Sequence, residues 1–244
     1  MKNKNWSAII FGFAIVLAAV FLGKAYVDSR STKGEISVTG LGKTDFVSDL
    51  IVWEGNFSAF SSELKDAYTA LNKDKNTIRK YLVNKGVKSE DIIFTAVQTD
   101  QRTKRNYSKD GDYLGEDFVG YVLKQSLSIE STEVNKIENI SREITELLNQ
   151  DVKFYSEAPR YYYTKLADLK IEMISKATED ARIRAENIAK FSGGKLGVLE
   201  SAKMGIFQIT GQNSSDNFSW GGTFNTSDKK KTASITMKLV YEVD

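Results

Sequence analysis

The sequence contains no cysteine and no histidine. Without cysteine the chain forms no disulfide and no thiolate zinc site, and it has no thiol nucleophile. Without histidine it lacks the side chain that most often acts as a general base near neutral pH. Carboxylate pairs, serine–lysine dyads and carboxylate metal sites stay open, but no spacing in the sequence selects one of them. We therefore expect a protein that is not an enzyme, with no catalytic residue, no metal site and no cofactor.

The sequence also has little net charge. Its 34 lysine and arginine residues against 32 aspartate and glutamate residues leave a formal charge of +2. A balanced surface exerts no long-range attraction on nucleic acid, so we expect no nucleic-acid partner. Two short basic clusters stand out, Arg102 with Lys104 and Arg105, and Lys229 to Lys231. Both lie near acidic residues in predicted loops, and we interpret them as solvated charge.

The one long apolar run lies near the N-terminus. Residues 6–23 (WSAIIFGFAIVLAAVFLG) carry no charge. As a helix they would span about 27 Å at about 1.5 Å per residue, close to the thickness of the bilayer core. Lys2 and Lys4 precede the run, which by the positive-inside rule keeps residues 1–5 in the cytoplasm. The alternative is a cleaved signal peptide, but its best cleavage site has Lys24 between the two small residues.

These observations predict the domain organisation and the location. Residues 6–23 form a single-pass anchor in the cytoplasmic (inner) membrane, residues 24–34 form a polar tether, and residues 35–244 form the folded domain. That domain is expected on the periplasmic, extracytoplasmic side. Two stretches without hydrophobic periodicity, residues 99–117 and 211–231, are predicted to be long mobile surface loops.

Three amphipathic helices are predicted from apolar residues at three- and four-residue steps. They cover about residues 62–85, 133–149 and 165–191, with Gly86 as a stop for the first and Gly193-Gly194 for the third. The apolar stripe of the third helix is Leu166, Leu169, Met173, Ala177, Ala181, Ala185 and Ile188. Because its alanines are small, this helix can pack close to its neighbour. Its polar residues Asp180, Arg182, Arg184 and Glu186 are interpreted as a solvated face.

Segments of alternating apolar and polar residues separate these helices and predict strands. The clearest are residues 121–129 and 235–243, and the others are 35–40, 50–60, 91–98, 152–155 and 196–207. One apolar face per strand is typical of antiparallel sheets that helices cover on one side. We predict an α+β fold with antiparallel sheets, helices packed on one face and two lobes, preceded by one N-terminal transmembrane helix.

Four segments at the joints of this order carry a family resemblance. They are ISVTGLG from Ile36, the Gly86–Ile92 turn, GYVLKQSLSIE from Gly120, and ATEDARIRAENIAKFSGGKLGVL over Ala177–Leu199. In order and spacing they closely resemble the SIMPL-domain family of exported bacterial proteins over about residues 35–243. The family usually has Pro-Asp before its second strand, whereas this chain has Ser48-Asp49. For Gly40 and Gly42 of the first segment we expect positive φ in a tight connection.

The resemblance implies a homo-oligomer in the cell envelope and a link to stress tolerance. We therefore expect a non-catalytic protein that self-assembles or binds an envelope partner. The aromatic residues expected at its contact surface are Tyr155, Tyr161, Tyr162, Tyr163 and Trp220. The alternative is a binding module for a small envelope ligand, a glycan or peptide held between the lobes, and a hydrolase ranks third.

Overall fold

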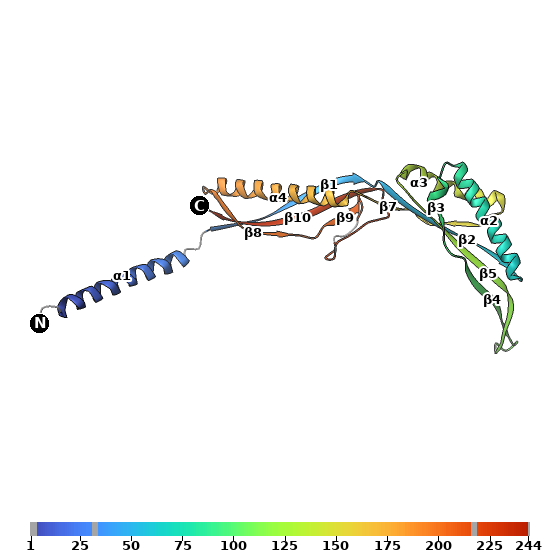
Figure 1. The fold of residues 1–244 in the computed structure, drawn as a ribbon, viewed down its shortest axis with the longest axis horizontal. Helices are drawn as coiled ribbons and strands as arrows, with labels where there is room; N and C mark the ends of the chain where they lie inside the picture. Colours follow the sequence, from blue (N-terminus) through green and yellow to red (C-terminus); the bar gives the residue numbers. More distant parts are fainter. Residues whose placement is uncertain (1–3, 31–33, 216–218, 244) are drawn as a thin grey trace. The chain divides into compact units, whose positions relative to one another are not determined.

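The computed structural model describes residues 4–30, 34–215 and 219–243 (Figure 1). The N-terminal helix α1 spans Lys4–Arg30. Its segment Ile9–Tyr26 is long and apolar enough to cross a membrane, and no part of it is buried against the rest of the protein. Such a helix serves either as an anchor or as a signal sequence. Residues 24–30 of the predicted tether continue this helix, whereas residues 31–33 lie outside the described residues.

The rest of the chain confirms the predicted α+β class with antiparallel sheets. The remaining helices are α2 (Leu64–Asn84), α3 (Val134–Glu143) and α4 (Leu166–Phe191). The strands are β1 (Gly34–Val47), β2 (Leu50–Ser61), β3 (Ile92–Phe94), β4 (Gln98–Tyr107), β5 (Tyr113–Ser131), β6 (Phe154–Ser156), β7 (Arg160–Tyr162), β8 (Leu196–Met204), β9 (Gln208–Gly211) and β10 (Lys230–Val243). The body divides into two compact units: residues 34–41, 177–205 and 236–243 form the smaller, and residues 42–176 and 206–235 the larger.

The larger unit is built on a six-stranded sheet. Its central pair is β2 and β5, which run antiparallel from Ile51 opposite Ser131 to Ser61 opposite Tyr121. Strands β3 and β4 pair with β5, and β6 and β7 pair with β2. Helices α2 and α3 lie over this sheet (Figure 1). The largest fully buried side chains of this core are Ile51, Trp53, Phe57, Leu71, Ile78, Leu82, Leu123, Leu127, Ile129, Ile137 and Ile144.

The ends of α2 and α3 follow their local sequence. Gly86 has φ +86° and its N–H donates to the Val83 carbonyl, which is the predicted stop of α2. The second predicted helix is divided in two. After α3 ends at Glu143, residues Ile144–Gln150 form a tighter 3₁₀ helix that closes at Asp151 with φ 62°. This tighter turn still buries Ile144 and Leu147 in the core.

The smaller unit shows why its first strand contains a glycine. Its sheet has the order β1-β10-β8. The α4 residues Ala177, Ala181 and Ala185 are fully buried, as the small-residue stripe predicted. A Cβ on Gly40 would lie 2.1 Å from the Ala177 carbonyl oxygen and 2.4 Å from the Ala181 nitrogen. Gly40 therefore lets the backbones of β1 and α4 approach closely.

This contact corrects two expectations. Gly40 and Gly42 lie within the extended strand β1 rather than in a tight connection, and a positive φ is recorded for neither. In the apolar stripe of α4, Ile188 is 49 % exposed, and its neighbour Ala189 is buried instead. Ala189 continues the four-residue spacing of the buried alanines, and its small side chain fits the close approach that Gly40 permits. The larger side chain of Ile188 is directed toward solvent instead.

The predicted loop at residues 99–117 is wrong, because this segment is a β-hairpin. Strand β4 and the first half of β5 pair from Gln98 opposite Lys124 to Tyr107 opposite Tyr113. A turn closes the hairpin, in which Gly111 has φ +92° and donates to the Ser108 carbonyl. Both faces of this hairpin meet solvent, so it shows none of the apolar alternation that marks a half-buried strand.

The second predicted loop, residues 211–231, is shorter than expected. Strand β9 extends to Gly211 and β10 begins at Lys230, so the connection covers 212–229. Within it, residues 216–218 lie outside the described residues. Gln208 holds the connection, because its side-chain amide donates to the Ser219 carbonyl at 2.8 Å and accepts the Thr223 N–H at 2.7 Å.

Candidate contact surface

The five aromatic residues singled out in the sequence lie in different environments. Trp220 is 95 % exposed in the β9–β10 connection, and Tyr155 of β6 is 59 % exposed. Tyr162 and Tyr163 are half-buried, and the Tyr163 ring packs on Phe46 with centroids 4.9 Å apart. Tyr161 is buried in the core of the larger unit. Its ring is therefore not available to a partner, which leaves Trp220 and Tyr155 as the exposed members of the set.

Tyr161 belongs to a buried polar cluster that the sequence did not reveal. Burial and the neighbouring Glu138 carboxylate raise the pKa of Tyr161 to about 12. A hydrogen bond and ion pair from Lys229 lower the pKa of Glu138. The Lys231 ammonium donates to the Tyr161 carbonyl, and burial lowers the pKa of Lys231 to about 8. We call Glu138, Tyr161, Lys229 and Lys231 the β10 lysine cluster.

This cluster corrects the interpretation of Lys229 to Lys231 as solvated charge. Only Lys230 is exposed, whereas Lys231 is 2 % exposed and Lys229 is partly buried in its ion pair. Lys230 is exposed at the first position of β10, whereas residues 231–235 that follow it are all buried. The cluster ties β7 and β10 to α3 and is a structural contact within the larger unit.

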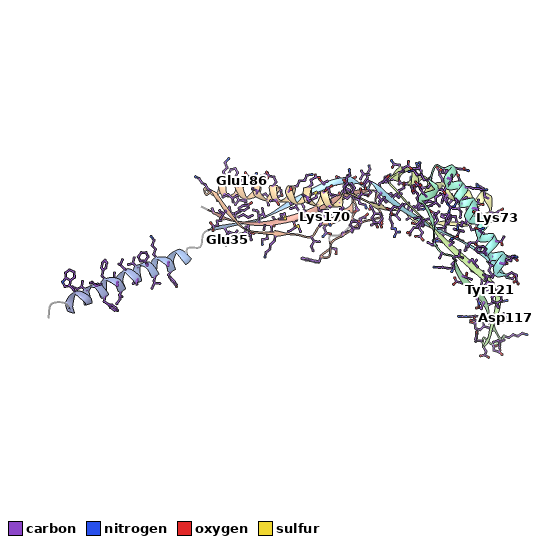
Figure 2. All side chains as sticks on the ribbon, in the orientation of Figure 1. Glu35, Lys73, Asp117, Tyr121, Lys170 and Glu186 are labelled. Atoms are coloured by element: carbon purple, nitrogen blue, oxygen red, sulfur yellow. The ribbon has the colours of Figure 1, made fainter. Side chains whose placement is uncertain are left out.

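A group of exposed aromatic residues of the larger unit lies on the hairpin of β4 and the first half of β5. We call residues 98–120 the β4–β5 arm. Figure 1 shows the arm running beyond the part of the sheet that α2 and α3 cover. At about 3.3 Å per residue, the 10 residues of β4 extend about 33 Å. Figure 2 labels Tyr121 just past the base of the arm and Asp117 farther out.

One face of the arm carries a row of aromatic rings. At the tip, the rings of Tyr107 and Tyr113 lie edge to face with centroids 5.9 Å apart. Near the base, Phe118 packs on Tyr121 in the same way at 5.1 Å. Tyr107, Tyr113 and Phe118 are 52–57 % exposed. We call these four rings the aromatic row.

Hydrogen-bonded polar side chains separate the two aromatic pairs of this row. The Glu116 carboxylate accepts from the Thr103 hydroxyl at 2.6 Å and from Arg105 Nε at 3.0 Å. These two contacts, above all the hydrogen bond from the Thr103 hydroxyl, lower the pKa of Glu116. Glu116 therefore stays ionised near neutral pH and holds the two strands together across the middle of the arm.

The opposite face of the arm is charged. Asp117 accepts from the Asn106 amide at 2.7 Å. Closer to the base of the arm, Lys124 forms an ion pair with Asp100 at 2.9 Å. The Arg102 guanidinium lies 5.5 Å from the centroid of the Phe60 ring on β2. Arg102, Lys104 and Arg105, predicted as solvated loop charge, are thus strand residues whose side chains are exposed.

The sequence does carry a signal for the arm. Asp110-Gly111 is a favoured turn pair, and tyrosines stand at 107 and 113 on either side of it. The alternation of charged and polar residues in between concealed the two strands. The Asp110-Gly111-Asp112 sequence forms this turn, in which the Ser108 N–H donates to the Asp112 carbonyl at 2.8 Å. Among the described residues no three acidic side chains gather as a metal site.

A second candidate site is an open groove at the start of α3. It has a volume of about 590 Å³ and is lined by residues 47–49, 132–136 and Lys229. Its charges are satisfied, since Lys136 pairs with Glu133 at 2.9 Å and Lys229 with Glu138. Ser48 replaces the proline usual in the resembling family, and its buried hydroxyl has no hydrogen-bond partner among the described residues. Asp49 beside it accepts from the Thr164 N–H and hydroxyl, each at 2.7 Å, and so fixes the turn into β2.

Comparison with known proteins bears on the family and not on the activity. No curated protein matches the sequence. Residues 36–238 match the family described as "SIMPL: Protein of unknown function (DUF541)". The match covers most of the chain, from β1 through the middle of β10, and includes the β4–β5 arm. The chain is therefore a member of the SIMPL family.

Proposed function

We propose that this protein is a non-catalytic, membrane-tethered component of the bacterial cell envelope that assembles with copies of itself. In this proposal α1 is an uncleaved anchor in the cytoplasmic membrane, and the body lies on the periplasmic, extracytoplasmic side. The observation that carries the proposal is the aromatic row on the β4–β5 arm, which leaves large apolar rings in water on a projecting element.

Two physical arguments support self-assembly through exposed aromatic residues. Exposed apolar groups that gather on one face mark contact surfaces, and tyrosine and phenylalanine are enriched there. A two-stranded ribbon is marginally stable in water without further packing, so a partner against the arm would stabilise it. An anchor such as α1 would also confine the copies to one membrane, which raises their effective concentration and strengthens a weak contact.

The test is the mass of the full-length protein in detergent, measured by light scattering over a range of concentrations with the detergent contribution subtracted. We expect a discrete oligomer. Replacing two rings of the aromatic row, Phe118→Ser with Tyr113→Ser, should lower the mass and leave the circular dichroism spectrum unchanged. The matched control is Phe191→Ser, because Phe191 is 84 % exposed at the end of α4 and lies outside the arm. A wild-type protein that is monomeric at all concentrations refutes self-assembly.

The second candidate function is a binding module for a small envelope ligand such as a glycan or a peptide. The groove at the start of α3 favours it, because apolar residues such as Val134 line it beside the charged side chain of Lys136. A ligand in this groove would raise the melting temperature of the wild-type protein. Lys136→Ala should abolish that rise without changing the oligomer mass, which separates this function from self-assembly.

A further inference from the structure

Both long edges of the β4–β5 arm lack a neighbouring strand. Strand β4 pairs with β5 on one side, and no described strand pairs with its other side. On β5 the pairing with β2 ends at Tyr121, so no strand that the structure describes pairs with residues 113–119 on that side. Each edge therefore presents a row of backbone N–H and C=O groups that another strand can pair with.

The two free edges carry opposite charge. Strand β4 contains three cations, Arg102, Lys104 and Arg105, against the single carboxylate of Asp100. Residues 113–119 of β5 contain two carboxylates, Glu116 and Asp117, and no cation. Within the arm, Lys104 stands opposite Asp117, and Arg105 stands opposite Glu116. A second arm placed beside the first at the same level would continue this alternation of positive and negative side chains.

Charge decides between the ways in which two arms can meet. If β4 met β4 of another copy, six cations would lie together, and if β5 met β5, four carboxylates would lie together. Like charges directly opposite one another destabilise a sheet. If β4 met β5 at the same level, Lys104 and Arg105 would each lie between two carboxylates. Such a contact joins two different surfaces, so it repeats from copy to copy instead of closing a two-fold dimer.

We propose that the β4–β5 arms of neighbouring copies pair edge to edge, the free edge of β4 in one copy against the free edge of β5 in the next. The pairing extends the two-stranded ribbon into a wider sheet and aligns the aromatic rows of successive copies on one face. This inference rests on the proposed self-assembly and names the surface through which it occurs.

The competing explanation is that the charges protect the edges. Natural proteins place charged residues on exposed edge strands to prevent pairing. Protection of the edges alone does not account for the aromatic row. In an isolated ribbon these rings would only expose apolar surface to water, which gives the ribbon no benefit. It also does not require the cations and the carboxylates to lie on separate strands. The two explanations predict opposite results when the arms are cross-linked.

The absence of cysteine from the chain allows a cross-linking test without background. Full-length chains carrying Lys104→Cys and chains carrying Asp117→Cys, with different tags, are co-expressed, purified in detergent and mildly oxidised. We expect a disulfide-linked dimer that carries both tags, and no dimer when either variant is expressed alone. The matched control pairs Asp117→Cys with Lys73→Cys, because Lys73 is exposed on α2 outside the arm (Figure 2), and it should give no dimer.

Each other outcome has a defined meaning. A dimer from Lys104→Cys alone, or from Asp117→Cys alone, shows like edges together and overturns the proposal. No mixed dimer, in a protein whose mass shows an oligomer, also overturns it but leaves self-assembly standing on another surface. A wild-type protein that is monomeric refutes both the edge pairing and the proposed self-assembly.

A charge exchange provides a second measurement that does not depend on cysteine. Chains with Lys104→Glu and Arg105→Glu place carboxylates on both facing edges, and chains with Glu116→Lys and Asp117→Lys place cations on both. Neither chain should form the wild-type oligomer alone, and co-expression of the two should restore its mass. If the mixture stays dissociated while both variants retain their circular dichroism spectra, the arms do not pair by these edges.

Discussion

Replacing Lys231 by methionine should stabilise the protein at neutral pH. Lys231 is 2 % exposed, and its ammonium donates to the Tyr161 carbonyl within the β10 lysine cluster. Burial lowers its pKa from the ordinary 10.5 to about 8, although the Asp228 carboxylate acts in the opposite direction. Methionine has a similar length and no charge, so it fills the same space without the cost of a buried ammonium.

The magnitude follows from the pKa. Each pKa unit corresponds to about 1.4 kcal/mol, so holding the charged amine in the fold costs about 3 kcal/mol below pH 8. Losing the hydrogen bond to the Tyr161 carbonyl costs about 1 kcal/mol in return. We therefore expect Lys231→Met to raise the free energy of unfolding by about 2 kcal/mol at pH 7.

The pH dependence of the free energy of unfolding provides an independent test of this effect. Because the folded pKa of Lys231 is lower than the unfolded pKa, the unfolded chain binds more protons between about pH 8 and 10.5. The wild-type free energy of unfolding should therefore gain a contribution from this group as the pH rises through that window. The variant lacks this contribution, so its advantage over the wild type should shrink as the pH rises.

The assay is urea unfolding of the full-length protein in mild detergent at several values between pH 7 and pH 10, followed by tryptophan fluorescence. Trp53 is fully buried in the same unit as Lys231 and reports its unfolding, whereas Trp6 and Trp220 are exposed. Lys230→Met serves as the control, because Lys230 is exposed on the neighbouring position of β10. A Lys231→Met protein that is less stable than wild type at pH 7, or whose advantage does not change with pH, refutes the reasoning.

Two further predictions concern the smaller unit. Gly40→Ala places a methyl group 2.1 Å from the Ala177 carbonyl oxygen, and overpacking of this kind should lower the free energy of unfolding in urea by about 2–3 kcal/mol. Gly34→Ala, whose methyl group meets Val243 Cβ at 3.6 Å, should change it little, and equal losses for the two variants would contradict the close-packing argument. Asp180→Asn removes the carboxylate that accepts the Leu41 N–H at 2.8 Å, a contact that lowers the pKa of Asp180. Its melting temperature should fall below that of the wild type at pH 7, and the difference should vanish as the pH drops below 3.8 through the folded pKa, when the wild-type carboxyl is protonated too.

Features with a local cause were predictable from the sequence. The alanines at 177, 181 and 185 recur every fourth residue, which places them on one helix face whatever lies against it. The stops at Gly86 and Gly193, both with positive φ, need only the conformational freedom of glycine. The strands β2 and β5 were predictable because each alternates between an apolar and a polar face, whereas their pairing was not.

Features that depend on distant residues were not predictable in the same way. Lys231 sits in a run of three lysines that looks solvated, and its burial depends on Tyr161, which lies 70 residues away in the sequence. Gly40 resembles a turn residue until the close approach of α4 is known. The β4–β5 arm shows no apolar alternation because water meets both of its faces. The candidate surface was therefore placed on Trp220 and the aromatic residues of segment 155–163, of which Tyr161 proved to be part of the core.

The sheet order β1-β10-β8 has a consequence for the order of folding during synthesis. Strand β1 is the first strand of the body and β10 is the last, so their pairing closes almost the whole body into one loop. A ribosome releases β1 long before β10 exists, and long-range pairing is slow because the loop entropy is lost before the contact forms. The β2–β5 sheet, by contrast, lies in one continuous stretch of chain and can form while the ribosome is still adding residues. The Gly40 strand must therefore wait, unpaired, until the final residues emerge, and that interval is when this chain is most exposed to aggregation or to the help of a chaperone.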